Sequence, residues 1–103
     1  MDSAARDRRR AERFRISLAV EFGLGRGVTR DVSASSVFFE MDVHDLGAEI
    51  SLAPGSPIGF ALVFEHREGA FRVPCRGAIV RVEWVHTTRV GIAADILSYR
   101  FEE

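Results

Sequence analysis

Cysteine, lysine and histidine are scarce in this chain. The 103 residues include one cysteine, no lysine and three histidines. A single cysteine, Cys75, excludes an intramolecular disulfide and a zinc site built from several thiolates, and it fits a reducing, cytoplasmic location. His44, His66 and His86 lie far apart without metal-ligand spacing. We expect these histidines to be surface or packing residues and Cys75 to be a small buried strand residue.

Long apolar runs are also absent. No run approaches the roughly 18 residues that a membrane-spanning helix needs, and the arginine-rich N-terminus has no apolar signal core, so we expect neither membrane insertion nor export. With 47% hydrophobic and 28% charged residues, the composition is that of one globular domain. The net charge of -1 gives no overall attraction to nucleic acid or to an anionic membrane.

Catalytic constellations are not found either. Ser33, Ser35 and Ser36 lie near Asp31, but no nucleophile elbow, activated cysteine or carboxylate pair accompanies them. We therefore expect a protein that is not an enzyme and that has no metal and no cofactor.

Arginine is concentrated at the N-terminus. Residues 1–15 hold six arginines and three acidic residues, a net charge of +3, whereas residues 16–103 hold eight arginines and twelve acidic residues, a net charge of -4. We predict a flexible arginine-rich arm over residues 1–15 and a single β-barrel domain over residues 16–103. Guanidinium groups bind phosphate and the acceptor edge of guanine through paired hydrogen bonds. The alternative is a merely solvated, disordered arm.

Short stretches of alternating apolar and polar residues fill the rest of the chain, and this period of two is typical of half-buried strands. Antiparallel strands of this length, without helical patterns long enough for parallel crossovers, favour a small all-β barrel of about six strands. The strand that returns through residues 71–73 either ends at Pro74 or continues past it. The alternating stretches are residues 16–22, 58–64, 78–84 and 90–94, with further strands at 28–32 and 37–41 and turns at 23–27 and 65–69.

Three segments depart from this pattern. Residues 37–41 place apolar side chains on both faces, so we expect a helix or a partner to cover the outer face. Residues 42–56 have no sustained period and predict a long connection with one helical turn. Residues 95–103 predict a short C-terminal helical turn with Ile96, Leu97 and Phe101 facing inward.

Two short motifs lie on either side of the first predicted strand. The first motif is Arg9-Arg10-Ala11-Glu12-Arg13 and the second is Asp31-Val32-Ser33-Ala34-Ser35-Ser36. In this order, within an all-β sequence of this length, they resemble the PilZ domain. The family pattern is an arginine, three residues and an arginine, followed further along by Asp or Asn, one residue, Ser, two residues and Gly. The resemblance continues through residues 37–40, 77–83 and 90–92.

The resemblance implies a six-stranded antiparallel barrel that binds cyclic di-GMP. It also implies that Arg9 and Arg13 grip phosphates and guanine. Asp31 would accept hydrogen bonds from a guanine, and Ser33 would contact a phosphate. These roles suit the donors and acceptors of each side chain. Arg8 or Arg10 would contribute as well, because the arginine run leaves the motif's register open by one residue.

Ser36 stands where the family has its closing glycine. If the position requires a positive φ, serine costs about 1–2 kcal/mol, which corresponds to roughly a tenfold loss of affinity. If instead the side chain occupies the ligand's space, binding is lost completely.

Two functional hypotheses follow. The first is a bacterial cyclic di-GMP receptor and adaptor whose arginine arm closes over the dinucleotide and changes a surface for a downstream protein partner. The second is a degenerate PilZ-like adaptor for motility or surface attachment, which binds its partner through residues 37–41 without cyclic di-GMP. Binding of RNA or single-stranded DNA is disfavoured, because the body is acidic and lacks basic residues interleaved with exposed aromatics.

Overall fold

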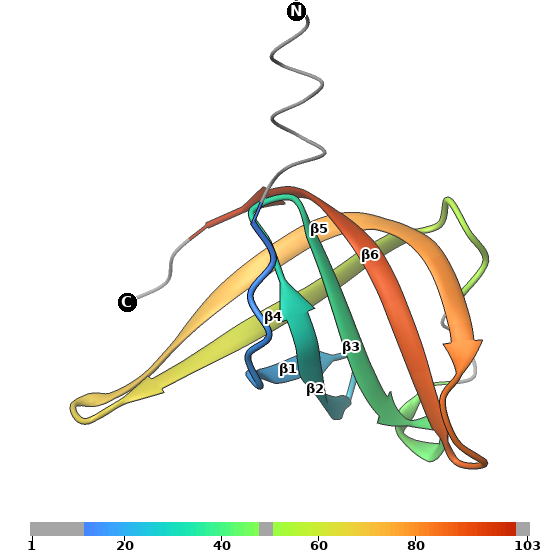
Figure 1. Cartoon of the computed structure of the whole chain (residues 1–103), viewed down its shortest axis with the longest axis horizontal. Helices are drawn as coiled ribbons and strands as arrows, with labels where there is room; N and C mark the ends of the chain where they lie inside the picture. Colours follow the sequence, from blue (N-terminus) through green and yellow to red (C-terminus); the bar gives the residue numbers. More distant parts are fainter. Residues whose placement is uncertain (1–11, 48–50, 101–103) are drawn as a thin grey trace, which may run out of the picture.

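The computed structural model describes residues 12–47 and 51–100 (Figure 1). Six antiparallel strands form a closed barrel in the order β1-β2-β3-β6-β5-β4, which confirms the predicted all-β fold. None of the helical structure in these residues is long and apolar enough to cross a membrane. The elements are β1 (Ala19–Phe22), β2 (Gly25–Val32), β3 (Ser36–Asp42), the 3-10 helix η1 (Val43–Asp45), β4 (Pro57–His66), β5 (Gly69–Trp84) and β6 (Arg89–Tyr99).

Strand β1 closes the barrel. Four residue pairs join it to β2 and three join it to β4. The residues before β1 are held by the buried Thr29 of β2, whose hydroxyl donates to the carbonyl of Ile16 and accepts from the N–H of Leu18. The predicted turn at 23–27 is shorter than expected, because β2 already begins at residue 25. Gly23 has a φ of 62°, which glycine adopts without steric cost.

The barrel interior is filled by inward-facing side chains of β1, β3, β4, β5 and β6, and Val32 of β2 packs against them. The ring of Phe39 lies 6.0 Å from that of Phe22 and 5.7 Å from that of Phe60. The predicted inward alternations over residues 58–64 and 90–94 are confirmed. The buried cluster consists of Val20, Phe22, Val37, Phe39, Met41, Ile58, Phe60, Leu62, Val73, Cys75, Ile79, Val90, Ile92 and Ala94.

Strand β5 is continuous over 16 residues, so Pro74 does not end it. Pro74 lies opposite Ala61 of β4. Proline cannot donate a backbone hydrogen bond, but its carbonyl accepts one from the N–H of Arg100 at 3.1 Å. The hairpin formed by β4 and β5 extends beyond the barrel (Figure 1) and turns at Arg67 and Glu68.

Three extra residues interrupt the strand ladders. Register shifts leave Arg30 of β2, Val80 of β5 and Leu97 of β6 without an opposite residue. Such β-bulges reverse the alternation of the residues that follow. The predicted alternation of residues 78–84 is therefore wrong at Val80, which is 46% exposed, while the adjacent Ile79 is buried.

The predicted C-terminal helical turn is also wrong over the described residues. Asp95 to Tyr99 continue β6 and pair with β5. Leu97 is the extra residue of a bulge and is 73% exposed, so the alternation that would have revealed a strand is broken there. Phe101 lies outside the described residues.

No helix covers the outer face of β3 in the part of the chain that the structure describes, so the helix expected there is not found, and cover by a partner stays a prediction. Phe38 is the one apolar side chain of residues 37–41 that faces outward. Its ring lies 5.7 Å from the guanidinium carbon of Arg81 and over Gly91, where an added Cβ would come within 2.5 Å of it. The outward Glu40 is buried by ion pairs with Arg30 at 2.7 Å and Arg89 at 3.5 Å. Residues of β2, β5 and β6 therefore contact the outward side chains of β3.

The connection after β3 begins as predicted. A single helical turn, η1, follows β3, and Asp42 caps it by accepting the backbone N–H of His44 at 2.8 Å. This hydrogen bond is the main cause of a lowered pKa for the Asp42 carboxyl group, to which the His44 ring also contributes.

Replacement of Phe39 by alanine tests the assignment of the core. Phe39 is fully buried among two other phenylalanines, so we expect Phe39→Ala to lower the free energy of unfolding by about 3–5 kcal/mol in urea titration. Leu24→Ala is the matched control, because Leu24 is fully exposed in the β1–β2 turn, and it should change stability by less than about 0.5 kcal/mol. Equal losses in both variants would contradict the assignment.

Candidate functional site

The second motif begins on the outer face of the barrel. Asp31 of β2 lies opposite Phe38 of β3, which lies opposite Ala93 of β6. Ala93 in turn lies opposite Arg81 of β5. These residues form one row across four strands, and Figure 1 shows β3 and β6 side by side at its centre. Because the bulges at Arg30 and Val80 adjoin the two ends of the row, they bring Asp31 and Arg81 into line with it.

A cavity of about 310 Å³ lies over this row, and we call it the β3–β6 groove. Asp31 and Arg81 stand on opposite sides of Phe38 and Ala93. Ser36 and Asp95, which lie opposite each other in the ladder, border it at one end. The lining residues are Arg13, Asp31, Ser36, Val37, Phe38, Val80, Arg81, Ala93, Ala94 and Asp95.

A short backbone bridge places Arg13 at this groove. The N–H of Phe14 donates to the carbonyl of Val32 at 2.8 Å, and the N–H of Val32 donates to the carbonyl of Phe14 at 2.9 Å. The neighbouring residues Arg13 and Asp31 consequently meet, with 3.2 Å between the Nη1 and Oδ1 atoms. The side chain of Arg13 is 63% exposed. Exposed ion pairs contribute about 0–1 kcal/mol, so Asp31 holds this guanidinium only weakly.

Ser33 organises the turn between β2 and β3. It is buried, and its hydroxyl oxygen accepts the N–H groups of Ser35 at 3.2 Å and Ser36 at 3.1 Å. Its own N–H donates to the carbonyl of Ser36 at 2.8 Å. Ser33 thus shapes the backbone beside Asp31 rather than lining the groove, and its contact with a phosphate remains a prediction.

Ser36 does not adopt the conformation that favours glycine. Among the described residues, only glycines have a positive φ. The conformational cost considered for serine at this position therefore does not arise. The Ser36 hydroxyl lies 3.1 Å from that of Ser33, so it is engaged within the turn although the residue borders the groove.

Arg81 and Asp95 belong to the groove but were missed by sequence reasoning. The guanidinium carbon of Arg81 lies over the Phe38 ring, 5.7 Å from its centroid, and the Nε of Arg81 lies 3.4 Å from Glu83. The only signal in the sequence was an arginine inside an alternating stretch. The bulge at Val80, which orients Arg81 toward the groove, cannot be recognised from the sequence pattern. Arg8, Arg9 and Arg10, which were predicted from the first motif, lie outside the described residues.

Cysteine and histidine are the other side chains of the described residues that could carry chemistry. Within residues 12–47 and 51–100, no three His, Cys, Asp or Glu side chains cluster in a way that could hold a metal. Cys75 is buried as predicted, and burial raises the pKa of its thiol to about 11. The thiol therefore stays protonated at neutral pH. His44, His66 and His86 are exposed, in agreement with a surface role.

Comparison with known proteins supports the architecture. No model of a protein family matches the chain, and no curated protein matches it. Among solved structures it is similar to the Bacillus subtilis inhibitor of motility MotI/DgrA, with a TM-score of 0.66 and 12% sequence identity over 87% of this chain. The chain spans 43% of that protein's length. This likeness supports the fold that the PilZ resemblance implied.

Substitution of Ser36 tests the geometry of the turn. Ser36→Gly removes the hydroxyl contact with Ser33 and adds backbone freedom at a position without a positive φ. We expect it to lower the free energy of unfolding by about 0.5–1 kcal/mol in urea titration. Ser36→Ala removes only the hydroxyl and should cost less. A gain in stability from glycine would show that the serine backbone is strained.

Proposed function

We propose that this chain is a cyclic di-GMP receptor and adaptor that holds the dinucleotide in the β3–β6 groove. One observation carries the proposal. Arg13 of the first motif and Asp31 of the second form an ion pair at a groove that Ser36 also lines. These two motifs carried the PilZ resemblance, and Arg13 of the first lies beside Asp31 of the second.

The chemistry of the groove suits a guanine dinucleotide. The Asp31 carboxylate accepts the N1–H and N2–H of a guanine, and Arg13 binds a phosphate or the O6 and N7 edge. Arg81 supplies a second guanidinium on the opposite side, where it lies over the Phe38 ring. A planar guanidinium also stacks on a base. The groove therefore contains side chains that can bind both the guanine bases and the phosphates of the dinucleotide.

The bridge between Phe14 and Val32 connects the arm to the site. It fixes the chain directly beside Asp31. We propose that Arg8, Arg9 and Arg10 close over the bound dinucleotide from this anchor. Closure orders the arm at a cost in conformational entropy that the charge-assisted contacts must exceed. The closed arm then presents a changed surface to a protein partner in the cytoplasm, and the likeness to a motility inhibitor supports motility as the regulated process.

A nucleotide-independent adaptor is the alternative function. It rests on Ser36 at the glycine position and on residues 37–41 as the partner surface. The geometry favours the receptor, because Phe38 is the one outward apolar side chain of that segment and packs on Arg81 and Gly91. The alternative predicts a folded protein that does not bind cyclic di-GMP.

Calorimetric titration with cyclic di-GMP distinguishes the two functions. We expect saturable binding to the unmodified chain and at least tenfold weaker binding by Arg13→Ala and by Asp31→Ala, which equals about 1.4 kcal/mol or more. Arg67→Ala is the control, because Arg67 lies at the hairpin tip outside the groove, and it should bind as the unmodified chain does. Absence of both heat and thermal stabilisation at high ligand concentration would reject the receptor and leave the adaptor.

The same titration on Ser36→Gly resolves the role of that side chain. Since the backbone is unstrained and the hydroxyl is turned to Ser33, we expect an affinity within about threefold of the unmodified chain, or less than about 0.7 kcal/mol. A gain of tenfold or more would show that the serine side chain occupies space that the ligand needs.

A further inference from the structure

The described lining of the β3–β6 groove includes two carboxylates, and only one of them is paired with an arginine. Asp31 lies 3.2 Å from Arg13. Asp95 is exposed, and within residues 12–47 and 51–100 it takes part in no ion pair or side-chain hydrogen bond. An unpaired negative charge beside the phosphates of a dinucleotide raises the free energy of the complex. The presence of Asp95 in this groove therefore requires another partner in the ligand.

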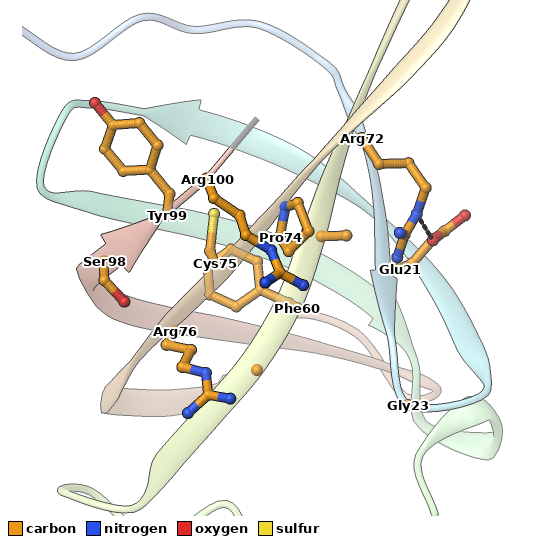
Figure 2. A pocket seen from close by; sticks show the side chains of 12 residues that line it. Glu21, Gly23, Phe60, Arg72, Pro74, Cys75, Arg76, Ser98, Tyr99 and Arg100 are labelled. Atoms are coloured by element: carbon orange, nitrogen blue, oxygen red, sulfur yellow. Dashed lines mark hydrogen bonds and ion pairs between the residues drawn. The ribbon is translucent and has the colours of Figure 1, made fainter. Parts of the chain in front are cut away.

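The carboxylate of a second cavity shows the paired arrangement that Asp95 lacks. This cavity of about 610 Å³ lies over β4, and Figure 2 shows it from close by. The acidic residue that lines it, Glu21, lies 2.7 Å from the Nε of Arg72 and 3.4 Å from Arg26. The hydrogen bond from Arg72 is the main cause of the lowered pKa of the Glu21 carboxyl group. The carboxylate of Asp95, in contrast, is available to the donors of a ligand.

The backbone at Asp95 is fixed beside the turn of the second motif. Asp95 lies opposite Ser36 of β3. The N–H of the next residue, Ile96, donates to the carbonyl of Ser35 at 2.8 Å. On the other side, Gly77 allows β5 to approach closely, because an added Cβ there would overlap the backbone oxygen of Asp95. The position of Asp95 is therefore determined by both neighbouring strands.

The surroundings of Asp95 leave room for a base. Its partners in the ladder, Ser36 and Ala78, are small, and so is Ala93, which precedes it by two residues and lines the same groove. Asp31 lies two strands and two residues away from Asp95, which corresponds to about 12 Å between the backbones at usual strand spacings. The two carboxylates are therefore too far apart to bind the edge of one base, and each can bind a different base.

We propose that Asp95 is a specificity-determining residue that binds the second guanine of the dinucleotide while Asp31 binds the first, an inference that rests on the proposed function. A carboxylate accepts the adjacent N1–H and N2–H donors of guanine. Adenine has an acceptor at N1, which a carboxylate repels, so the residue also acts against the wrong base. Arg13 and Arg81 remain available for the phosphates. The groove thus selects dinucleotides in which both bases are guanine.

Calorimetric titration with cyclic di-GMP and with the mixed dinucleotide cyclic GMP-AMP of the same linkage tests the inference. We expect the mixed dinucleotide to bind the unmodified chain at least tenfold more weakly, because its adenine must face one of the two carboxylates. If only Asp31 recognised guanine, either ligand would place a guanine there. The two affinities would then differ by about twofold, which is the statistical advantage of two equivalent guanines over one.

Asp95→Asn identifies the carboxylate responsible. It removes the charge and replaces one acceptor by an amide donor, and because Asp95 is exposed, the thermal midpoint should stay unchanged. We expect cyclic di-GMP to bind this variant at least fivefold more weakly and the mixed dinucleotide no more weakly, so that the ratio of the two affinities falls below about threefold. Glu68→Gln removes the same charge at the exposed hairpin tip outside the groove and should leave both affinities unchanged.

The outcomes separate this inference from the proposed function. Affinities within about twofold of each other in the unmodified chain, or a ratio that Asp95→Asn leaves unchanged, would overturn the role of Asp95 and retain the receptor. A gain in affinity for both ligands in Asp95→Asn would also overturn it, since the carboxylate would then act only by repelling phosphate. Absence of binding of either dinucleotide to the unmodified chain would instead reject the receptor, and the role of Asp95 with it.

Discussion

Strand β1 closes the barrel, and the chain just before it determines where the candidate site forms. This strand contributes only four residues and joins β2 to β4. Just before it, the buried hydroxyl of Thr29 holds Ile16 and Leu18 against β2, and Phe14 continues the pairing to Val32. Residues 13–22 therefore both close the barrel and place Arg13 beside Asp31. The candidate site depends on the same stretch of backbone as the closure of the barrel.

The β-bulges change the direction in which some side chains point on the outer face of the barrel. A regular ladder would alternate strictly, and each outward residue would have a fixed place. The extra residues Arg30 and Val80 directly precede Asp31 of β2 and Arg81 of β5. The resulting register shifts place both charged residues in the row that crosses Phe38. The third, Leu97, lies in β6 next to Ser98. Two of the three bulges thus adjoin charged side chains of the β3–β6 groove.

These irregularities also explain which parts of the structure could be predicted. Alternation over residues 58–64 and 90–94 indicated strands correctly, because hydrophobic burial imposes a period of two on regular strands. The strand over residues 95–99 and the exposure of Val80 could not be read from the pattern, because an extra residue reverses the phase. Asp31 and Ser36 were predicted from a motif, and the structure places both at one groove. Arg81 was missed because its position depends on a bulge.

The contact between Phe38 and Gly91 has a consequence for how sequences with this barrel can diverge. Gly91 lies under the Phe38 ring, and a Cβ there would come within 2.5 Å of Phe38 and 3.0 Å of Val85. A side chain at position 91 would lift the ring from β6 and push it into the space above the row. We therefore expect positions 38 and 91 to be coupled during evolution. In related sequences, an aromatic residue at the first position should accompany glycine at the second, and loss of either should be followed by a change in the other.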